Sequence, residues 1–178
     1  GQQVEGTVRL TASEVVAARV LPPILAELRE REPGIATVVV ASDAVANLLR
    51  READIAVRMM RPAQASLIAR RIGTWPIGAY AHHSYLERRG RPRRPDDFAT
   101  HDLVGFEHGD DIERGFRAQG AAIDPRRFAL RTEHQLVYWE AIRAGLGIGF
   151  AARWLARQDA GIEAVMPELR IPPLTMWL

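Results

Sequence analysis

Cysteine and lysine are both absent from this chain of 178 residues. Without cysteine the protein can form no disulfide and has no thiolate for catalysis, which fits a reducing compartment. Without lysine it can hold no Walker-type phosphate loop, Schiff base or serine–lysine pair. All 24 basic residues are therefore arginines, and against 22 acidic residues they leave a net charge of only +2. That balance gives little reason to expect nucleic-acid binding by these residues.

Long hydrophobic runs are also missing. No apolar run approaches the roughly 18 residues that a membrane-spanning helix requires, and no signal peptide is recognisable. Hydrophobic residues make up 47% and charged residues 26%, as in ordinary globular proteins. We expect one or two small domains with a buried core and no membrane partner. Because the sequence opens with Gly1, we expect either a native start upstream or a removed tag.

One kind of unit occurs twice, an amphipathic stretch followed by a tight turn and a short apolar run. The first copy covers residues 47–58 and the second covers residues 140–150. Short apolar runs of this kind are typical of buried parallel strands. Two such units predict two α/β lobes, and a cleft between lobes is a common place for a small molecule to bind.

Periodicity predicts the elements between and around these units. A strand at 7–12 alternates with period two, and Ser13 stands where it can cap the following helix. Pro22-Pro23 should bend or restart that helix, and a strand at 36–41 completes a parallel crossover. We further expect helices at 44–51, 84–89, 96–100, 135–144 and 152–158, strands at 54–58, 67–73, 77–81, 103–107, 128–131, 147–151 and 173–178, and a mostly irregular segment at 108–127.

Motifs for catalysis, metals and nucleotides are weak. A nucleotide loop follows a strand and opens a helix, whereas Gly145-Leu-Gly147-Ile-Gly149 follows a helix and opens a strand. We interpret it as a C-cap glycine with close strand packing. The five histidines lack metal-ligand spacing, and no serine lies in a Gly-x-Ser-x-Gly turn. The arginine-rich run at 87–95 has no interleaved aromatics and predicts a solvated loop. We expect no catalytic residue, no metal and no cofactor.

Two places where a strand gives way to a helix could bind an anion. Thr11 and Ser13 stand at the first, and Thr132 and His134 stand at the second. Unpaired backbone N–H groups and the helix dipole favour negative charge there, and the hydroxyls could add donors. Plain N-capping by the same residues is the alternative, and the adjoining glutamates would partly cancel the field.

Several motifs recur in a fixed order over almost the whole chain, and together they resemble the effector-binding domain of the LysR-type transcriptional regulators. They are Gly6-Thr-Val-Arg-Leu-Thr-Ala-Ser13, Val20-Leu-Pro-Pro-Ile-Leu25 with Glu32-Pro33-Gly34, Glu52-Ala-Asp-Ile-Ala-Val-Arg58, Tyr85-Leu-Glu-Arg-Arg-Gly-Arg-Pro92 and Ala144-Gly-Leu-Gly-Ile-Gly149. No single motif is diagnostic, but the ordered set is specific.

The resemblance implies an α/β fold of two Rossmann-like lobes with a ligand cleft between them, like the type 2 periplasmic binding proteins. Lobe I would comprise 1–73 plus 166–178, and lobe II would comprise 74–165. The effector would be a small metabolite, often a carboxylate or an aromatic compound. By position, the family's ligand contacts fall on Thr11, Ser13, Arg58, Met60, Phe106, Thr132 and His134.

Two roles remain open for some of these residues. Arg58 could bind a carboxylate of the effector with two hydrogen bonds, or it could form an ion pair with a neighbouring acid. Met60 and Phe106 would supply apolar walls, or simply core.

The function implied is that of a cytoplasmic effector sensor, not an enzyme. Whole family members carry an N-terminal winged helix-turn-helix domain that these residues do not include, so operator DNA would be bound only through that domain. Self-association into dimers, or tetramers at full length, is implied too, and RNA polymerase is a further candidate partner. The alternative is an extracytoplasmic solute-binding protein of a transporter, which has the same fold.

Overall fold

A computed structural model describes residues 4–43, 53–62 and 67–178 of the chain. The predicted helix at 44–51, and with it the beginning of the first repeat, lies outside the described residues. Contacts divide the chain into two compact units: unit 1 comprises Gly1–Thr74 and Thr175–Leu178, and unit 2 comprises Trp75–Leu174. In the parts that the structure describes, none of the helices has the length and apolar character needed to cross a bilayer.

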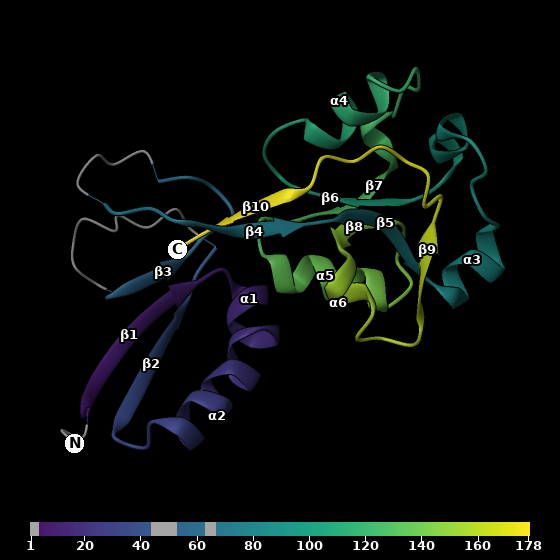
Figure 1. Cartoon of the computed structure of the whole chain (residues 1–178). Coiled ribbons are helices and arrows are strands. Elements are labelled where there is room, and N and C mark those ends of the chain that lie inside the picture. Colours follow the sequence, from purple (N-terminus) through teal and green to yellow (C-terminus); the bar gives the residue numbers. More distant parts are fainter. Residues whose placement is uncertain (1–3, 44–52, 63–66) are drawn as a thin grey trace. The chain divides into compact units, whose positions relative to one another are not determined.

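Unit 1 is built on a three-stranded parallel sheet with the order β2-β1-β3. Its strands are β1 (Gly6–Ala12), β2 (Ile35–Ala41) and β3 (Ile55–Val57). Between β1 and β2 the chain forms α1 (Glu14–Arg19) and α2 (Leu21–Arg31), and these helices lie beside the two strands (Figure 1). The predicted strand–helix–strand crossover is confirmed.

The Pro22-Pro23 pair restarts the helix instead of bending it. Helix α1 ends at Arg19, Val20 separates the helices, and the prolines occupy the first turn of α2. A proline costs little there, because the N–H groups of a first turn have no partner within the helix. The restart lets α1 bury Val15 and Val16 against the end of β1, whose residues from Leu10 onward are buried.

The chain passes between the units through β4 (Arg71–Trp75) and β10 (Leu174–Trp177), which pair with each other. The backbones of Arg70 and Leu178 extend this pairing with two hydrogen bonds of 2.8 Å. The predicted strand at 67–73 was wrong in its start, because the side chain of Ile68 is 98% exposed and faces no core. On the unit 2 side, the Trp75 ring packs edge-on against Trp154, with centroids 4.9 Å apart.

Unit 2 contains an antiparallel sheet and a parallel pair of strands. The antiparallel sheet has the order β8-β5-β9, with β5 (Ile77–His82), β8 (Gly149–Ala152) and β9 (Ile162–Val165). The parallel pair is β6 (Leu103–Gly105) with β7 (Phe128–Arg131). Its helices are α3 (His83–Arg89), α4 (Asp111–Arg117), α5 (Gln135–Arg143) and α6 (Arg153–Ala156), with short 3₁₀ turns at Pro95–Thr100 and Pro125–Arg127 (Figure 1).

One expectation for unit 2 was wrong, and one strand was not predicted. The segment at 108–127 was expected to be mostly irregular because it carries four glycines or prolines, but it contains α4. Gly109 and Gly120 take positive φ on either side of that helix, and Gly115 lies within it without ending it. Acidic residues in the first turn of α4 and basic residues in its last turn suit the helix dipole. The short edge strand β9 was not predicted from the sequence.

The glycines at 145, 147 and 149 serve packing, as expected. Gly145 has a φ of 76° directly after the C-cap of α5. A Cβ on Gly147 would lie 2.5 Å from the carbonyl oxygen of Asp102, and one on Gly149 would lie 2.4 Å from a methyl carbon of Ile142. No side chain fits at either position without displacing its neighbour.

Residues 166–174 group with unit 2 in the structure, whereas the expected boundary assigned them to lobe I. Met166 belongs to the unit 2 core, and Leu169 packs against that core. Gln119 also exchanges hydrogen bonds of 3.1 and 3.3 Å with the backbone of Arg170. These contacts hold the segment on unit 2 until the chain enters β10.

Candidate functional site

The carboxyl ends of the three parallel strands in unit 1 gather polar groups at one edge of the sheet. Thr11 and Ser13 come from the end of β1, Ser42 and Asp43 follow β2, and Arg58 follows β3. The register aligns these ends, because Ala12 lies opposite both Ala41 and Val57. The carboxyl edge of parallel strands is where open α/β sheets bind ligands. We call Thr11, Ser13 and Arg58 the unit 1 cluster.

Arg58 is the centre of the unit 1 cluster. Its Nη2 donates a hydrogen bond of 2.9 Å to Thr11 Oγ1, and its Nη1 donates one of 3.2 Å to the carbonyl oxygen of Ser42. Burial lowers the pKa of the guanidinium, and the negative charge of Asp43 only partly offsets this effect. Within the described residues no carboxylate forms an ion pair with Arg58. The ion-pair alternative that the sequence left open therefore finds no partner there.

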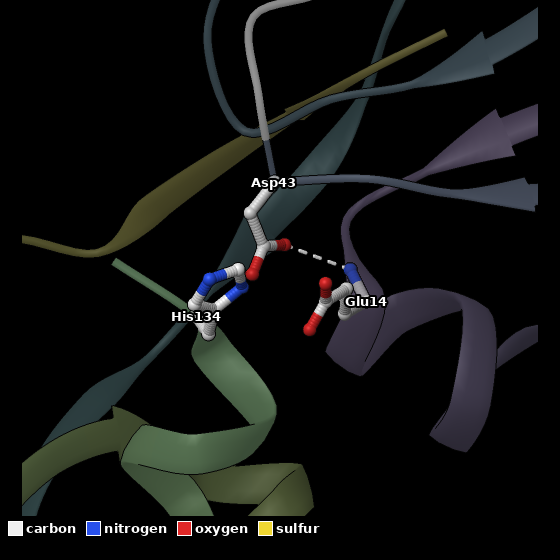
Figure 2. Close-up of side chains that lie close together, drawn as sticks. All are labelled: Glu14, Asp43 and His134. Atoms are coloured by element: carbon white, nitrogen blue, oxygen red, sulfur yellow. Dashed lines mark hydrogen bonds between the residues drawn. The ribbon is translucent and has the colours of Figure 1, made fainter. Parts of the chain in front are cut away.

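Ser13 occupies the N-cap position of α1, but its hydroxyl does not cap the helix. Asp43 takes that role: its Oδ1 accepts a hydrogen bond of 2.8 Å from the backbone N–H of Glu14 (Figure 2). The Ser13 hydroxyl oxygen is buried and has no hydrogen-bond partner among the residues that the structure describes. The expectation of capping by Ser13 was thus wrong, because the end of β2 brings in a competing acceptor.

Met60 lies two residues beyond Arg58, and its side chain is 65% exposed. It contributes neither core nor a buried wall to unit 1.

The predicted residues of unit 2 also lie at the carboxyl ends of parallel strands. Phe106 follows β6, Thr132 follows β7, and His134 is the N-cap residue of α5, at the start of the helix in Figure 2. Thr132 N–H donates to the Gly105 carbonyl over 3.1 Å, and Thr132 Oγ1 accepts from His134 N–H over 3.1 Å. The threonine hydroxyl thus orders the turn that leads into α5. We call Phe106, Thr132 and His134 the unit 2 cluster.

Phe106 forms one half of a stacked aromatic pair. Its ring lies parallel to that of Tyr138, with an angle of 5° and centroids 4.7 Å apart. Tyr138 is buried, which raises the pKa of its hydroxyl, and its Oη accepts a hydrogen bond of 2.7 Å from Phe150 N–H. Arg131 donates to the Phe106 carbonyl over 3.0 Å and forms an ion pair with Glu113. Stacking on Tyr138 therefore holds one face of the half-buried Phe106 ring, and Arg131 holds its backbone.

Sequence reasoning missed three residues that shape the two clusters: Ser42, Asp43 and Tyr138. Ser42 and Asp43 follow the second parallel strand directly, so the rule that ligands bind at the carboxyl ends of parallel strands would have found them. Tyr138 gave no such signal, because its contact with Phe106 joins residues 32 positions apart in different elements.

Within the described residues, the four histidines of unit 2 outside its cluster have structural roles. His108 lies next to Glu133, whose Oε1 accepts a hydrogen bond of 2.7 Å from the His108 backbone N–H. His82 Nδ1 caps α3 by accepting from Ser84 N–H, and it lies 2.8 Å from Ser84 Oγ. His83 pairs with Glu87 one turn along the same helix. The buried His101 shares a hydrogen bond of 2.9 Å with the Tyr85 hydroxyl.

The domain is of α/β type, and its candidate ligand contacts lie at two parallel-strand edges with polar donors, an arginine and an aromatic ring. The chain matches, over residues 1–178, the family described as the LysR substrate binding domain, and it belongs to that family. It is the effector-binding domain of a LysR-type transcriptional regulator, with the two-lobed α/β fold of the type 2 periplasmic binding proteins.

Relatives and solved structures agree with this assignment. The chain is 27% identical over 175 residues to the HTH-type transcriptional activator AaeR of Escherichia coli strain K12, covering 94% of this chain and 56% of AaeR. The structure of the CrgA regulatory domain of Neisseria meningitidis superposes with a TM-score of 0.84 at 22% identity, covering 98% of this chain and 88% of that one. The effector domain of AmpR of Pseudomonas aeruginosa gives a TM-score of 0.75 at 19% identity, covering 98% and 84%. The chain thus spans little more than half the length of AaeR.

Proposed function

We propose that this domain senses a small anionic metabolite, bound at the carboxyl ends of its parallel strands, and thereby controls DNA binding by the full-length regulator. The observation that carries the proposal is Arg58, a half-buried guanidinium without an ion-pair partner among the described residues.

The chemistry of Arg58 favours an anion. Charges removed from water are normally paired, because an unpaired charge costs several kcal/mol of solvation. Thr11 and Ser42 accept from two of the five guanidinium N–H groups. No acceptor for the other three lies among the described residues, so a ligand could accept from them. The buried Ser13 hydroxyl in the same cluster has a hydrogen to donate and no described acceptor. A carboxylate bound there would satisfy both groups, and each charge-assisted hydrogen bond contributes about 1.5–3 kcal/mol.

The unit 2 cluster supports an aromatic or otherwise flat effector. The Phe106 ring is held by stacking on Tyr138 and is only partly buried. A ligand ring against Phe106 would gain about 0.5–1.5 kcal/mol beyond the area that it buries. Thr132 and His134 would offer polar contacts at the start of α5.

Family membership supports the remaining parts of the proposal. An effector that binds one arrangement of the domain more tightly shifts the population towards it, and a difference of a few kcal/mol is sufficient. We infer self-association in the cytoplasm, operator binding through a DNA-binding domain outside these residues, and RNA polymerase as a further partner. The family match and relatives named as transcriptional regulators support this reading over a transporter's solute-binding protein or an enzyme.

Isothermal titration calorimetry with matched acids and amides tests the proposal. The probes are benzoate against benzamide and cyclohexanecarboxylate against its amide, because each pair differs mainly in charge. We expect each acid to bind at least about tenfold more tightly than its amide, and benzoate to bind more tightly than cyclohexanecarboxylate. Equal affinities for acid and amide, or no measurable binding of either acid, would overturn the proposal.

A further inference from the structure

Arg58 has a second set of partners that ligand binding does not require. Its backbone forms an isolated antiparallel bridge with Trp177: Arg58 N–H donates to the Trp177 carbonyl over 2.9 Å, and Trp177 N–H donates to the Arg58 carbonyl over 2.8 Å. Arg58 directly follows β3, which pairs with β1, and Trp177 ends β10, which pairs with β4. The bridge therefore joins the parallel sheet of unit 1 to the β4–β10 pair.

The β4–β10 pair contains both passages of the chain between the units. The chain leaves unit 1 after Thr74 in β4 and returns at Thr175 in β10. Trp177 lies two residues after the return, and the Arg61 guanidinium lies over its ring, 5.6 Å from the centroid. The segment that holds the backbone of Arg58 is thus the segment through which the units are connected.

We propose that Arg58 couples the effector site to the crossing strands, with its guanidinium in the site and its backbone in the bridge to β10. The inference rests on the proposed function for the identity of the occupant, and it adds the route by which occupancy is transmitted. The anchors on Thr11 and Ser42 fix the side chain at one end, and the two Trp177 hydrogen bonds fix the backbone at the other. An anion that accepts from the remaining N–H groups of Arg58 stiffens the side chain, so the bridge to Trp177 opens less often. Removing the hydrogen bond from Arg58 to Thr11 or Ser42 loosens the side chain, so the bridge to Trp177 opens more often.

Hydrogen exchange of the backbone amides measures this coupling without any ligand. Thr11→Val removes the acceptor of Arg58 Nη2 and keeps the shape of the buried side chain. Thr7→Val is the matched control, because Thr7 lies exposed on the same strand. We expect Thr11→Val to speed exchange of the Arg58 and Trp177 amides by about threefold to tenfold, while Thr7→Val and the β5–β8 amides of unit 2 stay at wild-type rates. Unchanged exchange at Trp177 in Thr11→Val would overturn the coupling, and faster exchange throughout unit 2 would also count against it, as general destabilisation.

The second part of the experiment measures hydrogen exchange in the presence of benzoate. At saturation it should slow exchange of the Trp177 and Arg58 amides in the wild-type chain. If benzoate binds and these amides do not respond, the coupling is refuted while the proposed function stands. If benzoate does not bind, the proposed function fails on its own titration, and the Thr11→Val comparison still decides whether the side-chain anchor and the bridge are linked.

Discussion

Replacing Ser13 with alanine should make the ligand-free domain more stable. A serine at an N-cap normally contributes about 0.5–2 kcal/mol, because its hydroxyl accepts a helix N–H. In this structure Asp43 accepts the Glu14 N–H instead, so that contribution is absent. What remains is a buried hydroxyl without a described partner, and such a group costs about 1–3 kcal/mol by protein mutational data.

The small loss of packing from removing one oxygen offsets part of this gain. We therefore expect Ser13→Ala to raise the free energy of unfolding by about 1 kcal/mol, equivalent to about 2–4 °C in Tm for a domain of this size. The same change should weaken benzoate binding by about tenfold, because a donor to the anion is lost. A residue that lowers stability and improves binding is expected at a functional site.

Urea denaturation followed by circular dichroism measures the first effect. Ser84→Ala is the matched control, because the Ser84 hydroxyl has His82 Nδ1 as a partner 2.8 Å away, and its removal should lower the free energy of unfolding. The two serines should thus give changes of opposite sign. A loss of about 1 kcal/mol or more in Ser13→Ala would show that its hydroxyl has a partner in the free protein, which would refute the reasoning.

Two further predictions concern unit 2. Burial lowers the pKa of His101 in the folded chain, and Arg89 lowers it further. The unfolded chain therefore takes up the proton first, so the free energy of unfolding should be highest above about pH 6.5 and fall as the pH drops below it. Urea titrations at several pH values should show this slope, and His101→Gln should lack it. Tyr138→Phe should cost about 1–3 kcal/mol in urea denaturation, because Phe150 N–H loses its acceptor. A cost near zero would mean that this N–H finds another partner.

Much of the fold could be predicted from local patterns. The alternation of 7–12, the proline pair and the apolar run at 36–41 predict the crossover of unit 1, because period and helix breakers act over a few residues. The family resemblance names both Thr11 and Arg58 as ligand contacts, and the structure joins them by a hydrogen bond. Helix α4 was not predicted, because glycine disfavours a helix and three glycines lie in or beside it, at 109, 115 and 120.

The missed details of the clusters are contacts between distant residues. Whether Ser13 or Asp43 caps α1 depends on where the end of β2 lies, which no local signal specifies. The stacking of Phe106 on Tyr138 likewise depends on how α5 packs beside β6. The sequence could identify residues of the right chemistry at the strand ends, but it could not decide which of their groups the fold itself would satisfy.

The central claim is that Arg58 binds the anion of the effector, and one titration tests it directly. Benzoate affinity is measured by calorimetry for the wild-type chain, for Arg58→Gln, and for Arg9→Gln as a control at an exposed arginine on β1. We predict that Kd rises by about ten- to hundredfold in Arg58→Gln and stays within about twofold in Arg9→Gln. Wild-type benzoate affinity in Arg58→Gln would contradict the account.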